Sequence, residues 1–499
     1  MNDLKIDRIL FFTAAFLVFL VCLPMGLMPE RSAAFVSQVY GWIASNLGFL
    51  YQWAAIGSIL FLLWLGLGRH GNIRLGDKDE RPEFSDFSWA GMLFCAGTGA
   101  SLLVWAGVEW AFYYDSPPFG VTPRSTEAIE WGSAYGLFHW GIIAWCFYAL
   151  PTIAIAYPFY VKKIPYLRAS TALHSILGPD GGNSTLGRIV DLACMIALLG
   201  GAGSSLSMIA PTIAATIATL LAIETSFVLE LIVILVCISL FSLSVYMGLE
   251  KGIKKLSDLN VYLAVAFLGF VLLAGPTLFI LKMSTDSIGF MLSNFARMTT
   301  WTDPVEQSGF VETWSIFYWA WWVAFAPPIG VFVTRISRGR TIRQVIFSMI
   351  LFGSLGCTLF YAILGNYSLS LELDQVISVT GSLKEEGMFV TVANVLDTLP
   401  FREGALALFA LVSIISVATT YDSASYTLAS TATKSLHEGD NPARWHRLFW
   451  AGVLGTLPIF MVFVGGLEVI RSGVLIASLP LLLVGLAMAG ALIKSLRQH

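Results

Sequence analysis

The stretch "FYWAWWVAFAPPIGVFVTRISRGRTIR", residues 317–343, combines features that rarely occur together. It holds three tryptophans in four residues, then two prolines and a glycine inside an apolar run, then four arginines in nine residues. Proline removes an amide donor and clashes with the preceding helical turn, so Pro327 and Pro328 predict an interrupted helix. Within a membrane, unwound backbone is tolerated only where it is buried in protein or lines a cavity.

The composition indicates an integral membrane protein. Of the 499 residues, 57% are hydrophobic and 12% are charged, whereas a soluble domain carries about 25% charged residues. A spanning helix needs about 20 mostly apolar residues, and we expect the first such run to be a retained helix, not a signal peptide. Twelve runs of this kind lie near residues 9–28, 48–67, 88–114, 132–161, 188–222, 226–248, 258–281, 313–336, 343–364, 403–433, 446–464 and 473–494.

The basic residues predict the orientation of these spans. With the N-terminus inside, 22 of the 29 Lys and Arg residues fall on one side and seven on the other. Because cytoplasmic loops are enriched in Lys and Arg, we expect a multi-pass protein of the cell (inner) membrane with both termini in the cytoplasm. The arginines of 335–343 then mark the cytoplasmic end of the eighth span, and topology and lipid headgroup contacts are enough to explain them.

Two spans carry helix breakers at corresponding places. In the third, "CAGTGAS" places Gly97 and Gly99 in an apolar run, and the eighth has the two prolines. Paired broken helices in two inverted halves indicate the binding site of a secondary transporter, although two unrelated kinks are the alternative. The predicted organisation is two peripheral helices in 1–87, a first repeat of helices 3–7 in 88–282, an interfacial helix and connection in 283–312, and a second repeat of helices 8–12 in 313–499.

Aromatic residues gather on the fourth and eighth spans. "FHWGIIAWCFY" carries Trp140, Trp145 and Tyr148, while Trp322 and Phe325 share a helix face at a spacing of three. A quaternary ammonium group has a permanent charge and no hydrogen to donate, so ring faces attract it, by about 0.5–2 kcal/mol per ring. The rings therefore predict a trimethylammonium site, with an aromatic-rich packing surface as the alternative.

Several motifs closely resemble the signature of the betaine/choline/carnitine transporter family. They are "TWSIFYWAWW" at 313–322, "TRISRGRT" at 334–341, "HWGIIAW" at 139–145, "VEWAFYY" at 108–114 and "TTYDSASYTLA" at 419–429. The resemblance covers nearly the whole chain. It implies an all-α, leucine-transporter-like fold of two inverted five-helix repeats with broken helices 3 and 8, transport of trimethylammonium compounds, and often a homotrimer in membrane lipid.

The same resemblance implies the substrate site. The family's aromatic box falls on Trp140, Trp145, Tyr148 and Trp322, with Trp321 and Phe325 beside it. The other end of the substrate is expected to meet the broken-helix backbone at Gly97 and Gly99. Glu109 resembles the carnitine-type branch and is a candidate coupling residue.

The resemblance also suggests a coupling ion. In sodium-driven members, the ion lies between backbone carbonyls of the broken helix and hydroxyls of helix 10, which here means Ala96, Gly97 and Thr98 with Thr419 and Thr420. Ser205 is a weaker candidate for a second ion. Sodium-independent exchangers carry an arginine and a methionine where this chain has Asn260 and Ile329, so we expect sodium dependence. The alternative for the threonines is back-bonding to the i−4 carbonyl.

The sequence thus predicts a secondary transporter of quaternary ammonium compounds, with sodium as the coupling ion. The alternatives are a sodium-independent exchanger of carnitine-type compounds and a facilitator or channel for an ammonium-like cation. Choline, glycine betaine, carnitine, butyrobetaine and a sulfonium analogue all remain open as substrates. Because the chain has no nucleotide-binding loop, no paired catalytic carboxylates and no metal cluster, we expect no enzymatic activity, no cofactor and no nucleic-acid partner.

Overall fold

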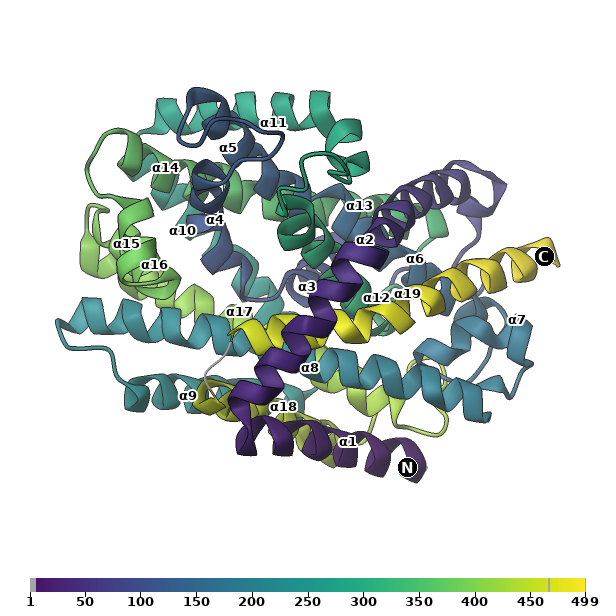
Figure 1. Ribbon diagram of the computed structural model, residues 1–499. Coiled ribbons are helices and arrows are strands. Elements are labelled where there is room, and N and C mark those ends of the chain that lie inside the picture. The colour runs from purple at the N-terminus through teal and green to yellow at the C-terminus, as the bar shows by residue number, and fades with distance from the viewer. Residues whose placement is uncertain (1–5, 465–466, 499) are drawn as a thin grey trace.

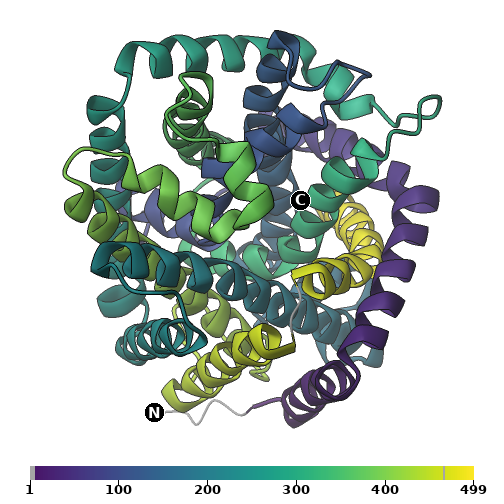
Figure 2. The same ribbon diagram turned by 60° about the vertical axis from the view of Figure 1, so that its left-hand side comes forward.

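The computed structural model describes residues 6–464 and 467–498, which form a bundle of helices (Figures 1 and 2). Over these residues the backbone has no β-strand beyond two isolated bridges. The α-helices are α1 (Arg8–Leu27), α2 (Pro29–Leu67), α3 (Asp86–Thr98), α4 (Leu102–Asp115), α5 (Thr126–Trp140), α6 (Ile142–Ala156), α7 (His174–Leu177), α8 (Thr185–Leu221), α9 (Phe227–Met247), α10 (Lys254–Ala274), α11 (Thr277–Thr300), α12 (Phe317–Ile336), α13 (Ile342–Phe360), α14 (Asn366–Leu373), α15 (Val379–Glu385), α16 (Met388–Asp397), α17 (Arg402–Thr431), α18 (Arg444–Val464) and α19 (Leu467–Arg497).

The helices confirm an all-α membrane fold. Among the described residues, nine helical segments are long and apolar enough to cross a membrane, and the bent pair of α3 and α4 makes a tenth. The two remaining predicted spans coincide with α1 and α18, whose side chains are only partly described. Most of α11 falls in the segment 283–312, for which an interfacial helix and connection were predicted, and α11 lies along one edge of the molecule in both views (Figures 1 and 2).

The predicted break in the third span is confirmed. Helix α3 ends at Thr98, α4 begins at Leu102, and the two helices are bent by 54° relative to each other. Gly99 follows α3 with φ +65°, a conformation that glycine adopts without steric cost. The last turn of α3 therefore points its carbonyl groups into the interior of the bundle without intrahelical amide partners.

The eighth span differs from the prediction, because α12 continues as one α-helix through Pro327 and Pro328. All 20 residues of α12 are buried, and it packs along α6, α8 and α19. Neighbouring helices can hold a membrane helix together where proline removes hydrogen bonds, so these prolines do not break it. The irregular backbone of this span lies earlier, in a π-helical turn at Val311–Ile316.

The fourth span has an interruption that the sequence analysis missed. Gly141, with φ −90° and ψ −136°, separates α5 from α6 and lies directly after Trp140. A Cβ atom at this position would lie 2.4 Å from the carbonyl oxygen of Leu137. Only glycine fits there, and the interruption places Trp140 at the end of α5 and Trp145 in α6.

Arg335, in the last turn of α12, and Arg340, just after that helix, have a structural role beyond topology. Arg335 bonds Glu83 at 2.8 Å, and Arg340 bonds Asp86 at 2.7 Å while its guanidinium lies 3.9 Å from the ring centroid of Trp89. Arg335 and Arg340 are only 3% and 4% exposed. These contacts fasten the end of α12 to the beginning of α3, the helix that carries the break.

Candidate functional site

The structure brings most of the predicted aromatic residues together in the bundle interior. The ring centroids of Trp140 and Trp322 are 4.9 Å apart, those of Tyr148 and Trp322 are 6.1 Å apart, and those of Trp145 and Tyr148 are 5.5 Å apart. Trp321 stacks on Trp322 at 5.4 Å. We call these five residues the ring cluster. Each is at most 5% exposed.

The rings in this cluster are in direct contact. Trp322 meets Trp140 at 70° and Tyr148 at 83°, which are the edge-to-face geometries that aromatic pairs prefer. Because the rings fill the space between them, a ligand that enters the cluster has to separate them. The structure therefore presents the cluster closed on itself.

Glu109 holds one side of the ring cluster. Its Oε2 atom accepts hydrogen bonds from Trp140 Nε1 at 3.2 Å and from the Tyr318 hydroxyl at 2.8 Å, and the Tyr113 and Tyr361 hydroxyls also donate to the carboxylate. The side chain is fully buried on α4. The predicted coupling residue thus contacts a ring of the site directly. The sequence signal was the resemblance of Glu109 to the carnitine-type branch.

His139 lies next to Glu109, with 3.8 Å between its Nδ1 atom and Glu109 Oε1, and also contacts the cluster. Its carbonyl oxygen accepts from Trp322 Nε1 at 2.9 Å. Its ring nitrogens lie 2.9 Å from the Tyr113 hydroxyl and 3.1 Å from Ser315 Oγ. The orientation of Trp322 therefore depends on a backbone group next to Trp140.

Glycines from two helices make the slot for Trp145. A Cβ atom added at Gly97 would lie 2.5 Å from Cη2 of this indole, and one added at Gly353 would lie 2.0 Å from its ring. Gly97 thus contacts the ring cluster, although the sequence analysis expected it at the other end of the substrate, and Gly353 on α13 was not foreseen. The broken helix and the cluster touch at this point.

Phe325 lies apart from the ring cluster. Its ring faces Gly201 of α8, where an added Cβ atom would lie 1.9 Å from the phenyl ring. With Ala96 and Thr420 it lines a cavity of about 10 Å³ between α3, α12 and α17. Phe325 is therefore nearer to the predicted ion site than to the other rings.

Polar side chains from α10 and α17 meet the end of α3. The Thr420 hydroxyl lies 3.3 Å from the Cys95 carbonyl oxygen and 2.9 Å from the Ser416 carbonyl oxygen, to which the Thr419 hydroxyl also donates at 2.9 Å. Ser416 Oγ donates to Asn260 Oδ1 at 3.0 Å. Thr98, Gly99 and these side chains line a cavity of about 20 Å³, enough for one water-sized sphere. We call the oxygen atoms of Thr98, Ser416, Thr419, Thr420 and Asn260, together with the Cys95 carbonyl oxygen, the oxygen cluster.

The oxygen cluster fits a monovalent hard cation. The atoms that could bind the cation are neutral hydroxyl, amide and carbonyl oxygens. The last turn of α3 adds the partly negative end of a helix. Thr420 and Thr98 are back-bonded to the i−4 carbonyls of Ser416 and Phe94. A hydroxyl that donates in this way keeps its oxygen lone pairs for a cation, so back-bonding and ion binding are compatible.

Ser205, on α8, lies beside the break between α3 and α4. A Cβ atom at Gly99 would lie 3.2 Å from Ser205 Oγ, and the serine is 4% exposed. No group of three or more His, Cys, Asp or Glu side chains suited to a transition metal occurs among the described residues.

Comparison with known proteins shows the family of this chain. Residues 9–499 match the sequence pattern described as "BCCT, betaine/carnitine/choline family transporter". The chain belongs to this family. The resemblance in the sequence motifs is thereby confirmed over nearly the whole chain, and the protein is a transporter, not an enzyme.

Two curated relatives match most of the length of this chain. It is 37% identical over 440 residues to the uncharacterized transporter YeaV of Escherichia coli (strain K12), spanning 88% of this chain and 90% of that protein. It is 32% identical over 493 residues to a carnitine transporter of Acinetobacter baumannii (strain ATCC 19606), spanning 99% of this chain and 89% of that protein.

A solved structure of a Na⁺-coupled sialic acid symporter, in a substrate-bound outward-open state, is also similar. It is 12% identical with a TM-score of 0.43, covering 89% of this chain and 85% of that one. This likeness is too distant to carry an argument about the site.

The contact between Gly97 and Trp145 yields a test. We expect Gly97→Ala to weaken substrate binding by about fivefold, because the added methyl group forces the indole from its rotamer at a cost of about 1 kcal/mol. Gly107→Ala on α4 is the matched control, since its Cβ atom would make only ordinary contacts from 3.7 Å. The measurement is titration of purified protein with carnitine, glycine betaine and choline. Equal affinities for both variants would contradict the assignment of Gly97.

Proposed function

We propose that this chain is a secondary transporter that carries trimethylammonium compounds by alternating access and couples their movement to sodium. The observation that carries the proposal is the ring cluster, in which five buried aromatic side chains from three helices meet. Ring faces attract a cation that has no proton to donate. The Glu109 carboxylate accepts a hydrogen bond from Trp140 and so lies beside this ring. A carboxylate near the rings favours a cation further.

The carnitine-type compounds are the favoured substrates within this class. The relative from A. baumannii, which is named as a carnitine transporter, matches 99% of the chain. Glu109 also stands in the "VEW" motif that resembles the carnitine-type branch. Choline and glycine betaine share the trimethylammonium group and belong in the same panel of candidate substrates.

Sodium coupling is supported by the oxygen cluster. Thr419, Thr420, Ser416 and Asn260 gather at the carbonyl end of α3, and none of the residues lining the cavity there is a lysine or arginine. A fixed positive charge that replaces an ion is therefore absent from this part of the described structure. Moving one sodium ion inward yields about 2.3 kcal/mol per 100 mV of inside-negative potential.

The substrate proposal predicts a difference between two tryptophans. Trp322→Ala should reduce substrate affinity strongly, because it removes a ring that contacts Trp140, Tyr148 and Trp321. Trp314→Ala is the control, since that side chain packs outside the ring cluster, 4.8 Å from Tyr113 and 6.1 Å from Trp105 between centroids. Trp322→Phe should recover part of the loss because it restores a ring face. Binding curves for the three variants decide the point, and equal losses for both alanine variants would count against the ring cluster.

The ion proposal predicts a specific effect of Thr420→Val. The change keeps the side-chain shape and removes one oxygen, so the sodium concentration for half-maximal uptake should rise several-fold, with substrate affinity reduced mainly at low sodium. Thr431→Val is the control, because Thr431 is also buried on α17 and lies three turns from Thr420. Uptake of radiolabelled carnitine into proteoliposomes, with and without a sodium gradient, measures both effects.

The same assay separates the proposal from its alternatives. If wild-type uptake is unchanged when potassium replaces sodium, sodium coupling is wrong. Counterflow in the absence of any sodium gradient would then identify an exchanger. Uptake that never exceeds the external substrate concentration would instead indicate a facilitator or channel.

A further inference from the structure

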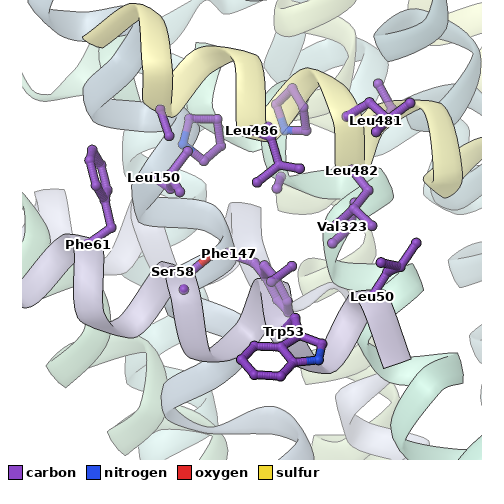
Figure 3. A pocket seen from close by; sticks show the side chains of 18 residues that line it. Leu50, Trp53, Ser58, Phe61, Phe147, Leu150, Val323, Leu481, Leu482 and Leu486 are labelled. Atoms are coloured by element: carbon purple, nitrogen blue, oxygen red, sulfur yellow. The ribbon is translucent and has the colours of Figure 1, made fainter. Parts of the chain in front are cut away.

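A second cavity lies outside the ring cluster, between α2, α6, α12 and α19 (Figure 3). Its volume is about 380 Å³, within the range of about 300–1,000 Å³ that is usual for small-ligand pockets. Helices α2 and α19 pass on opposite sides of it in Figure 3, and Phe147, Leu150 and Leu486 lie around the space between them. We call it the outer pocket.

The lining of the outer pocket is almost wholly hydrocarbon. Among its 18 lining residues none is charged, and the polar side-chain groups are the Ser58 hydroxyl and the Trp53 indole nitrogen. A zwitterionic or cationic substrate would find no charged partner here, although Trp53, Phe61 and Phe147 are aromatic. The chemistry selects an uncharged aliphatic ligand.

The mouth of the outer pocket faces the surroundings of the bundle. Trp53, Leu483 and Leu486 line the pocket and are 68%, 63% and 61% exposed. They lie on α2 and α19, both of which contain candidate membrane spans. An apolar opening on the outer face of such helices meets lipid tails, not water.

The depth of the outer pocket agrees with this environment. Pro327 is eight residues before Arg335, and Leu486 is eight residues before Lys494. At 1.5 Å per residue, each is about 12 Å from the basic end of its helix, which lies well inside a hydrocarbon core about 30 Å thick.

We propose that the outer pocket binds one acyl chain of a membrane phospholipid. In the bilayer the hydrophobic effect does not drive this binding, since lipid tails are as apolar as the pocket. The gain is packing: an empty pocket would leave its lining without contacts on one side. Hydrocarbon from the adjacent leaflet is the ligand that has the right chemistry and direct access.

The bound chain contacts the helices that carry the ring cluster. Val323 of the pocket follows Trp322 on α12, and Phe147 precedes Tyr148 on α6. Pro327 and Pro151 also line the pocket, and since proline has no amide proton, neither can donate to the carbonyl four residues earlier, on Val323 and on Phe147. The acyl chain thus packs on the part of each helix where backbone hydrogen bonds are missing.

Two pairs of glycines provide a matched experiment. Gly57 and Gly485 line the outer pocket, and a Cβ atom at either would meet nothing within 4 Å, so phenylalanine there fills the pocket without a backbone clash. Gly41 on α2 and Gly490 on α19 are equally open and lie outside the pocket. Each variant is reconstituted in vesicles that contain phosphatidylethanolamine with a photoreactive diazirine in one acyl chain.

Mass spectrometry then locates the crosslinks after illumination. The proposal expects labelled peptides from residues 50–61 and 481–489 in the wild type, loss of most of that label in Gly57→Phe and Gly485→Phe, and wild-type labelling in Gly41→Phe and Gly490→Phe. Gly57→Leu and Gly485→Leu repeat the test with a smaller side chain if a phenylalanine variant does not elute as a folded protein.

Two results would overturn the proposal. Equal labelling in pocket and control variants would mean that lipid contacts these helices without entering the pocket. A photoreactive amino acid at position 57 that crosslinks to a second copy of the chain, and not to lipid, would make the outer pocket a subunit interface.

Discussion

The break between α3 and α4 is the constraint on which the rest of the site depends. It leaves the carbonyl groups of one helical turn without intrahelical donors, in a membrane interior where an unsatisfied polar group costs several kcal/mol. Something must lie against that turn, and the structure supplies the hydroxyls of α17 and the amide of Asn260. A bound cation would satisfy the same carbonyls more fully, which is why the break and the oxygen cluster belong together.

The break also connects the ion side of the interior to the substrate side. Gly97, in the last turn of α3, forms part of the slot for Trp145, while α4, beyond the break, carries Glu109 and so holds Trp140. A change in the angle between α3 and α4 would therefore move two rings of the cluster at once. This shared dependence gives a physical route by which an ion at the end of α3 can affect the binding of a substrate between the rings.

Much of this arrangement could be predicted from the sequence, and the exceptions have a common cause. Gly97 and Gly99 act locally, through the backbone conformations that glycine allows, so their break was predictable. The effect of Pro327 and Pro328 depends on the helices packed around α12, and they leave it continuous. Likewise three of the four donors to Glu109 and the ion pairs of Arg335 and Arg340 depend on segments distant in the chain, which no local pattern reveals. Gly141 is a local feature that the sequence analysis missed, since its Cβ atom would clash with the Leu137 carbonyl four residues earlier. The division into two inverted repeats, the trimer and the orientation in the membrane stay predictions.

The central claim is that the buried rings recognise the positive charge of a trimethylammonium group, and tryptophan fluorescence tests it most directly because the cluster itself contains the reporting residues. Purified protein is titrated, with sodium present, with carnitine, butyrobetaine, glycine betaine and choline, and with analogues of each in which a carbon atom replaces the quaternary nitrogen. The account predicts a saturable change for at least one trimethylammonium compound and none for its counterpart of the same shape that lacks the positive charge, over the same concentrations. If both bind equally well, shape and not charge is recognised, and the ring cluster is not a cation site.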